Sequence, residues 1–395
     1  MALYRGAALP INDPLFQIAP HSVSRLKTLS IVARPEILPH IITHLPPSAP
    51  LLEMLDISHT YRSWTRHNLP FMATFFNGDL SSLRKLRLEG VRTDLPWRNM
   101  VNLTLVVLRN TPPDGPSIKQ LLDFFESAPR LRKIKLDSAT PATGEQRGRL
   151  VSLAYLKRMG ILWDSPSSLL LNHLLVPIGA KLSTRAGSSF YPIEGHPPGS
   201  LDNLRNISNI TTIQLRIRDF PCIKLSGPSG QLTMVSGIDA YLGLDSLARL
   251  DTSKVERLEI VSGDHPLTCL SYRGLLPLES LRTLTFSRCR EPYSFMAALG
   301  SNTTSSGVVT CPKLEEIILI PCTGTEVDIK SVTKIAAARF SGGVKLRTVR
   351  IGGGDKLNPG DVLELKKHVL NVECLPVIDE VKVDSDSDDS DEDFW

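Results

Sequence analysis

A recurring apolar pattern constrains the fold of this chain more than any other feature of its sequence. Each copy has an apolar residue, two variable residues, a second apolar residue, one variable residue and a third, as in Leu52-Glu-Met-Leu55-Asp-Ile57. The starts of successive copies mostly lie 20–33 residues apart, a period typical of stacked repeats. The eleven copies begin at Leu26, Leu52, Leu83, Leu103, Leu131, Leu156, Ile210, Val255, Leu281, Leu314 and Leu346.

The spacing inside each copy predicts a short β-strand with one buried face. Its second and third apolar residues are two positions apart, so they point to the same side of a strand. The residues between them are often charged, which leaves the other face in water. Between copies, segments 37–45, 118–125, 328–340 and 361–370 show apolar residues at helical spacing. Proline stands two residues before the first apolar residue of three copies, where it ends the preceding helix (Pro50, Pro129 and Pro312).

Helix, stop and short strand in repetition predict an α/β fold, a leucine-rich-repeat solenoid. We expect an irregular arc of short parallel strands with helices on its convex side, because no repeat can bury its apolar face alone. The predicted organisation is a lead-in over residues 1–20, the solenoid over 21–378 and a disordered acidic tail over 379–395. Two insertions interrupt the period, at about 162–209 and 216–254. The first begins with a predicted helix over 167–176, and the second contains a predicted hairpin around Gly227-Pro-Ser-Gly230.

The charged residues are unevenly distributed along the chain. The formal net charge is +4, with 45 basic and 41 acidic residues, but the segment Asp384–Asp393 carries seven acids and no base. The rest of the chain therefore has 45 basic against 34 acidic residues, a net charge of +11. Three serines lie among these acids, where acidophilic kinases phosphorylate, so we expect possible modification at Ser385, Ser387 and Ser390.

The variable residues of the repeats predict a basic stripe on the concave face. If the apolar residues face the core, the stripe consists of Lys85, Arg87, Arg109, Lys133, Lys135, Arg158 and Arg216. Such a surface fits an acidic or phosphorylated protein segment, whereas nucleic acid is unlikely because no aromatic residues interleave with the bases. The alternative is a solvated face balanced by Glu89 and Asp137. One hypothesis joins stripe and tail: the acidic tail occupies the stripe and competes with the ligand.

The sequence offers no catalytic, metal or cofactor site. It contains no phosphate-binding loop, dinucleotide fingerprint or nucleophile elbow. The six cysteines form no CxxC pair, so we expect reduced thiols in a cytoplasmic or nuclear protein. The longest apolar stretch is too short and too interrupted to cross a bilayer, and no membrane association is expected. We therefore expect a non-enzymatic protein.

Four features stand out: the Ser-Ala-Pro-x-Leu segments, Leu156-Lys-Arg-Met159 followed by Asp164-Ser-Pro-Ser-Ser-Leu-Leu-Leu-Asn-His-Leu174, Ile223-Lys-Leu-Ser-Gly-Pro-Ser-Gly230, and Leu281-Arg-Thr-Leu284. On these features the chain resembles the fungal (mushroom-type) F-box/leucine-rich-repeat proteins, over roughly residues 19–377. It implies that the repeats hold a protein substrate for ubiquitination, while an F-box helix bundle docks a cullin-ligase adaptor. No F-box is recognisable here, so adaptor binding is expected only with an F-box upstream of Met1. The alternative is a free-standing repeat scaffold without a ligase link.

Overall fold

The computed structural model shows an α/β protein whose strands are mostly parallel. The chain divides into two compact units, residues 1–189 with 202–205, and residues 190–201 with 206–395. The described residues are 25–33, 38, 41, 45, 48–59, 80–89, 100–109, 116–137, 149–163, 168–186, 203–217, 222–235, 251–263, 275, 278–289, 292–300, 310–321, 327–353 and 357–376.

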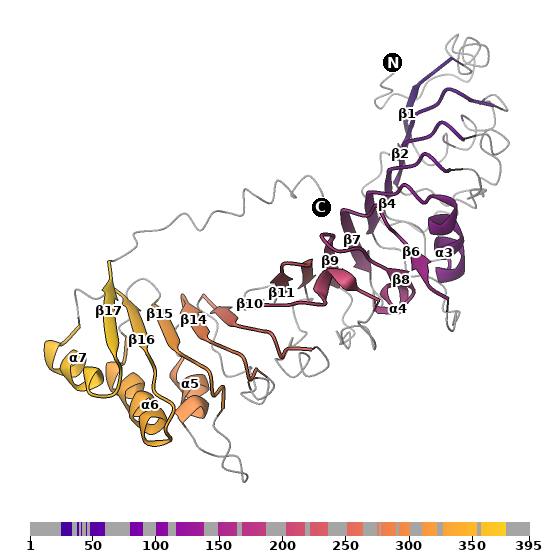
Figure 1. Cartoon of the computed structure of the whole chain (residues 1–395). Helices are drawn as coiled ribbons and strands as arrows, with labels where there is room; N and C mark the ends of the chain where they lie inside the picture. The colour runs from indigo at the N-terminus through magenta and orange to yellow at the C-terminus, as the bar shows by residue number, and fades with distance from the viewer. Residues whose placement is uncertain are drawn as a thin grey trace. The chain divides into compact units, whose positions relative to one another are not determined.

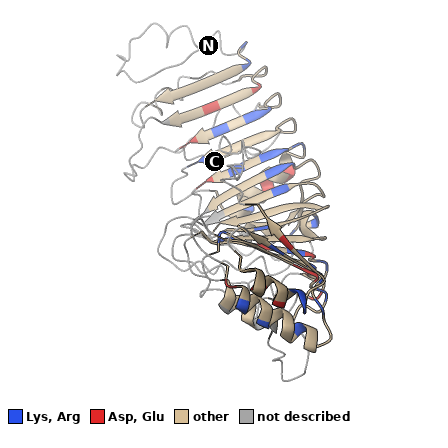
Figure 2. Ribbon diagram, turned by 90° about the vertical axis from the view of Figure 1, so that its left-hand side faces the viewer, with Lys and Arg blue, Asp and Glu red and all other residues tan. Residues whose placement is uncertain are grey.

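The first unit is built on seven parallel strands that follow one another in chain order (Figures 1 and 2). They are β1 (Thr28–Ala33), β2 (Met54–His59), β3 (Lys85–Glu89), β4 (Leu105–Arg109), β5 (Lys133–Asp137), β7 (Arg158–Trp163) and β9 (Lys181–Ala186). Behind them lie the short pair β6 (Val151–Ser152) and β8 (Leu174–Leu175) and the helices α3 (Ile118–Ser127) and α4 (Ser168–Leu171).

The second unit combines an antiparallel hairpin with six parallel strands. The hairpin strands β11 (Cys222–Gly227) and β12 (Gly230–Val235) pair with each other, and β11 also pairs with β10 (Thr212–Arg216). From β10 the parallel strands continue as β13 (Arg257–Val261), β14 (Thr283–Ser287), β15 (Glu316–Ile320), β16 (Thr348–Gly352) and β17 (Asn371–Leu375). A 3-10 helix, η2 (Arg205–Ile207), precedes β10 in the chain.

Three helices of the second unit pack side by side next to β14–β17 (Figure 1). They are α5 (Tyr293–Gly300), α6 (Ile329–Ser341) and α7 (Pro359–Lys366). The side chain of Asp328 accepts a hydrogen bond from the amide of Ser331 and so caps α6. Asn358 caps α7, whose first residue is the proline that suits that position. These two helices lie where the sequence pattern predicts helices.

The apolar pattern forms the core of both units. All eleven copies contribute a strand, and the second and third apolar residues of ten of them are buried, Leu29 of the first copy being half-buried. In β5, for example, Ile134 and Leu136 are buried, whereas Lys133, the first residue of the strand, is exposed. Because parallel pairing aligns equivalent residues, these side chains stack from strand to strand.

A tight turn before the strand explains why the first apolar residue of a copy is also buried. The amide of Leu52 donates to the carbonyl of Ala49, and Leu131 donates in the same way to Ala128. Both ends of each turn are buried, and the two middle residues point outward. Pro50, Pro129 and Pro312 occupy the second turn position, which favours the fixed φ of proline. The proline therefore suits this turn, and α3 ends at Ser127, two residues before Pro129, as predicted for a proline that ends the preceding helix.

At the start of most parallel strands, one carbonyl of the preceding strand segment accepts two hydrogen bonds and fixes the register. The carbonyl of Glu53 accepts hydrogen bonds from the amides of both Arg84 and Lys85, at 2.8 and 3.0 Å. The carbonyls of Lys27, Arg84, Thr104, Arg132, Thr211, Glu256, Arg282 and Glu315 do the same for the strand that follows. This repetition fixes the register, so equivalent positions of neighbouring strands lie next to each other.

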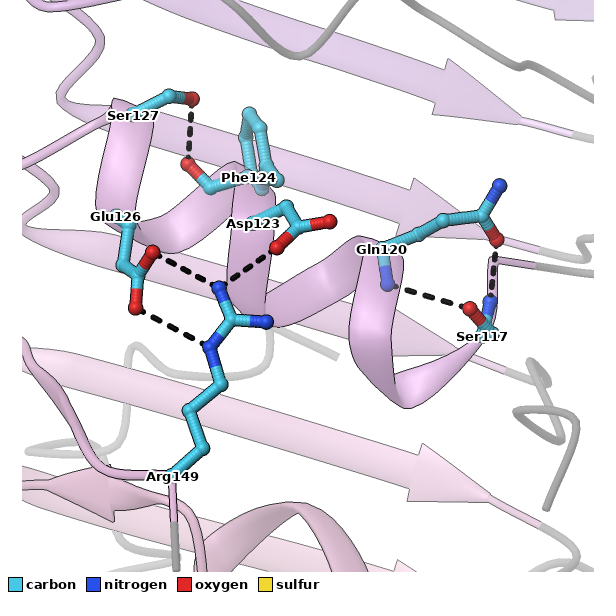
Figure 3. A network of polar contacts seen from close by, with 7 residues as sticks. All are labelled: Ser117, Gln120, Asp123, Phe124, Glu126, Ser127 and Arg149. Carbon is cyan, nitrogen blue, oxygen red and sulfur yellow. Dashed lines mark hydrogen bonds and ion pairs between the residues drawn. The ribbon is translucent and has the colours of Figure 1, made fainter. Parts of the chain in front are cut away.

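Helix α3 shows how a returning segment is anchored (Figure 3). Ser117 and Gln120 form a reciprocal capping box at its start. The guanidinium of Arg149, just before β6, contacts Asp123 at 2.6 Å and Glu126 at 2.8 Å. The apolar side of the helix, which includes Phe124 and Phe125, is fully buried.

The first predicted insertion differs from the expectation in two places. The helix predicted over 167–176 is only the four residues of α4, because Leu174 and Val176 enter extended pairing instead. The glycine- and proline-rich stretch after it contains β9, which pairs with β7 and continues the ladder. The second insertion contains the predicted hairpin. Its Gly227 is required because a Cβ there would lie 2.0 Å from the carbonyl oxygen of Asn209. The predicted helix at 37–45 and the tail lie largely or wholly outside the described residues.

Arg339 in α6 supplies a test of the packing in the second unit. This side chain is 1% exposed, and its guanidinium donates to the carbonyls of Leu299, Thr310 and Cys311 at 2.9–3.4 Å. We expect Arg339→Met to lower the free energy of unfolding by about 2–4 kcal/mol, because three buried carbonyls lose their donor. Unfolding of the full chain in guanidinium chloride measures this change in the free energy of unfolding. The exposed Lys330→Met on the same helix should change it by less than about 0.5 kcal/mol, and an equal effect of both would contradict the assignment.

Candidate functional site: a cationic sheet face

The face of the first unit opposite its core carries most of the predicted basic stripe. We call it the open face; it consists of the strand residues that alternate with the buried apolar ones. Six of the seven predicted residues lie on it (Lys85, Arg87, Arg109, Lys133, Lys135 and Arg158). The seventh, Arg216, belongs to β10 in the second unit and is described with that unit. Figure 2 shows these strands with their basic residues in blue.

Strand register arranges the open-face residues in rows. The first row runs along the strand starts as Lys85, Leu105, Lys133, Arg158 and Lys181. The second row consists of Asp56, Arg87, Val107, Lys135 and Gly160. The third row places Glu89 beside Arg109. Neighbouring strands lie about 4.8 Å apart, so basic side chains of one row can contact one ligand together.

The first row is the accessible part of this surface. Lys85, Lys133 and Lys181 are exposed, and none of their side chains forms a hydrogen bond or an ion pair with another described residue. Lys181 was not part of the predicted stripe, because β9 lacks the complete apolar pattern and its strand was not recognised. The sequence signal that remained was Leu182 followed two positions later by Thr184, a buried pair of which only one member is apolar.

The second and third rows contain both signs of charge. Arg87 lies between two carboxylates, at 3.0 Å from Glu89 and 3.9 Å from Asp56. Burial raises the pKa of Asp56, and the neighbouring Arg87 offsets this only in part. Glu89 therefore balances the charge of Arg87, as the alternative interpretation of the stripe expected. Because the positive charge of Arg87 is compensated within the face, it is less available to a ligand than the charges of the first-row lysines.

Lys135 is the unusual member of the set, because it is on the open face yet only 3% exposed. Burial, together with the charge of Arg109, lowers its pKa from 10.5 to about 8, although Asp137 acts in the opposite direction. A buried ammonium group is costly unless it is compensated. Lys135 therefore contributes to the electrostatic field of the face more than to direct contact.

The second unit has a polar face of different character. Arg216 donates to Gln214 at 3.2 Å, and Gln214 donates to Glu259 at 2.8 Å. Farther along, Arg350 lies between Glu316 and Glu373, at 3.1 and 2.7 Å. These charges are paired with one another. The predicted residue Arg216 thus belongs to an internally balanced network in its own unit.

The described residues offer little for covalent or metal chemistry. They contain no group of three or more His, Cys, Asp or Glu side chains placed to hold a metal ion. Cys289 and Cys311 are buried, and burial raises the pKa of the Cys311 thiol to about 12, so this thiol is not ionised at neutral pH. The three serines expected as phosphorylation sites lie outside the described residues.

Lys135→Met tests the electrostatics of the open face, since it keeps the length of the side chain and removes the charge. The folded-state pKa near 8 lies below the ordinary 10.5, so folding disfavours the charged amine below about pH 8. That cost disappears as the pH rises from about 8 to about 10.5. We expect the variant to be more stable than the wild type near pH 7 by on the order of 1–2 kcal/mol, with the difference vanishing near pH 10.

Urea unfolding at both pH values measures this difference, and Lys133→Met on the same strand is the matched exposed control. The control should show no such pH-dependent gain. A destabilised Lys135→Met protein near pH 7 would mean that the amine is well compensated where it lies.

Comparisons with known proteins identify no relative, so the functional conclusion is based on the geometry of the open face. A scan against protein-family models found no match, and a search of curated proteins found none either. No helix in the described part of the chain has the length and apolar character needed to cross a membrane.

Proposed function

We propose that this chain is a leucine-rich-repeat interaction module that holds a protein partner on the open face of its first unit. By its resemblance to the fungal F-box/leucine-rich-repeat proteins, it is the substrate-recognition repeat domain of an F-box type ubiquitin-ligase receptor. The repeat assignment is supported by the eleven copies of the apolar pattern, because each copy forms a strand. Strands are parallel and in register, as stacked repeats require.

The accessible first row of the open face carries the functional proposal. Lys85, Lys133 and Lys181 extend from every second strand of the ladder (β3, β5 and β9), and their side chains have no described partner. Unpaired ammonium groups at regular spacing favour an acidic or phosphorylated segment of a protein partner. Nucleic acid is less favoured, because the described residues of this face include no aromatic side chain on which bases would stack.

The alternative is a free-standing repeat scaffold that binds a partner without a ligase link. Both functions use the same face, and they differ only in whether the chain works together with a cullin-ligase adaptor. Cytoplasmic or nuclear localisation agrees with either function and follows from the cysteine usage.

Charge reversal on the first row tests the binding function. We expect the full chain carrying Lys85→Glu and Lys133→Glu to lose partners with acidic segments that the wild type retains in affinity capture, by about tenfold or more. The matched control carries Arg257→Glu and Lys313→Glu, two exposed residues of the second unit, and should retain them. Identical capture by both variants would show that the open face is not the binding surface.

Purified cullin-ligase adaptor separates the two functions. A stable complex with the full chain in size-exclusion chromatography supports the receptor, provided that the open-face variant still forms it. Partner capture without adaptor binding supports the scaffold instead.

A further inference from the structure

Apolar side chains lie between the basic residues of the open face, on β4. Two of the open-face residues of β4 are Leu105 and Val107, both half-buried, and we call this pair the apolar strip. The strands on either side hold basic residues at the paired positions, Lys85 and Arg87 on β3 and Lys133 and Lys135 on β5. In Figure 2, β3 and β5 carry blue segments, and β4 between them is mostly tan. The open face therefore combines an apolar centre with cations on both sides.

The core of the first unit does not require the apolar strip. The buried residues of β4 are Val106 and Leu108, which point to the opposite side of the strand. Because β3 and β5 hold basic residues at the positions paired with the strip, the ladder accepts polar side chains there. Leu105 and Val107 nevertheless leave apolar surface accessible in the middle of a charged face. An apolar centre with a charged rim is typical of a surface that binds a protein partner.

The two lysines beside the strip have charge available for a ligand. Strand register places Leu105 directly between Lys85 and Lys133 in the first row. Both lysine side chains are exposed, and neither has a described partner. In the second row, by contrast, Arg87 is ion-paired and Lys135 is buried. A ligand of this part of the face therefore meets two separate positive charges with an apolar residue between them.

We propose that the open face binds a segment of a protein partner in which one apolar residue lies between two acidic residues. This segment belongs to the partner of the proposed function, on which the inference rests. Its apolar side chain packs on the apolar strip, and its two carboxylates contact Lys85 and Lys133. Contact with the strip removes apolar surface of both molecules from water, while the two ammonium groups fix the position of the segment.

Strand geometry sets the spacing of the three residues in the segment. β3 and β5 are separated by two strand spacings, about 9.6 Å. In an extended segment that crosses the strands, alternate residues point to the same face and lie about 6.6 Å apart. An acidic residue, an apolar residue two positions later and a second acidic residue two positions after that span about 13 Å. The excess of about 2 Å at each end is small for the long, flexible side chain of a lysine.

The first row also offers a competing position for an acidic segment. Beyond Lys133 it continues with Arg158 and Lys181, and no apolar residue of the row lies between them. A segment with both acidic residues on that side of the strip would depend on Lys181 and not on Lys85. The two arrangements therefore differ in which exposed lysine they use.

Two peptides that differ in one residue test the contact with the apolar strip. Both have blocked ends and the pattern Glu-x-y-x-Glu, with serine or glycine at x, and y is leucine in one peptide and serine in the other. The full chain is passed over the immobilised peptides, and surface plasmon resonance gives the two dissociation constants. We expect the wild type to bind the leucine peptide about threefold or more tightly, because burial of the leucine side chain adds to the charge attraction.

Substitutions in the strip show whether the peptide leucine lies there. Leu105→Thr with Val107→Thr should reduce the difference between the two peptides to less than about 1.5-fold, because the leucine then loses its apolar contact. The matched control, Val32→Thr with Leu162→Thr, makes the same kind of change at half-buried open-face residues outside the strip. The control should retain the difference between the peptides.

Substitutions of the lysines show where the peptide carboxylates lie. Lys85→Gln and Lys133→Gln should each weaken binding of the leucine peptide by about twofold or more. Lys181→Gln is the matched control, since it removes the same charge from an exposed residue of the same row, and it should weaken binding less than either.

Several results would overturn the proposal. The leucine peptide may fail to bind, the wild type may bind both peptides equally, or the difference between them may persist in the strip variant. An effect of Lys181→Gln that matches or exceeds that of Lys85→Gln would place both carboxylates on one side of the strip. Circular dichroism confirms that each variant is folded, and if the double strip variant unfolds, Val107→Thr alone should still reduce the difference.

Affinity capture separates failure of this inference from failure of the proposed function. If the charge-reversed open-face variant loses its partners although the peptides show no dependence on the strip, the open face binds partners of another pattern. If the variant also retains its partners, the proposed function fails as well.

Discussion

The buried apolar pair of each strand is the interaction on which the rest of the structure depends. Two large apolar side chains per strand, such as Ile134 and Leu136, are removed from water only because the strands on either side carry an equivalent pair at the same register. At most parallel strand starts, a carbonyl that accepts hydrogen bonds from two amides enforces that register. Burial of each such side chain contributes about 1.5–3 kcal/mol to the free energy of folding, and a single repeat cannot bury its pair without the neighbouring repeats.

Because the buried apolar pair and the backbone hydrogen bonds hold the strands together, the alternate strand positions are not needed for the core. In the first unit they hold Lys85, Lys133 and Lys181, whose side chains have no described partner. They also hold Arg87, which pairs with Asp56 and Glu89. In the second unit Arg350 pairs with Glu316 and Glu373. The turns before the strands differ as well: exposed Leu51, Val101, Tyr155 and Ile178 lie in turns of the first unit, whereas Ser253, Lys254, Glu279 and Ser280 lie in turns of the second. The two units share one backbone design and differ in surface chemistry, and that difference is what a partner can recognise.

The strands were predictable because their pattern repeats, and exceptions to the pattern were missed. β9 has Thr184 where other strands have an apolar residue, and it lies within a stretch rich in glycine and proline. The predicted helix over 167–176 was too long because Leu174 and Val176 suit helical spacing as well as extended pairing. The hairpin around Gly227 was found because its turn residues allow few other conformations.

The sequence by itself determined the positions of the eleven strands that carry the apolar pattern, which side of each is buried and which of their residues reach the open face, since strand periodicity fixes these locally. Only the tertiary structure decided how those residues interact. Lys135 is buried although its position predicts exposure, Arg87 is held between two carboxylates, and Arg216 belongs to a separate, balanced network. It also showed that the turn residues line up at one edge. The physical reason is that pairing between strands, and hence the neighbours of every charge, depends on contacts between residues far apart in the chain.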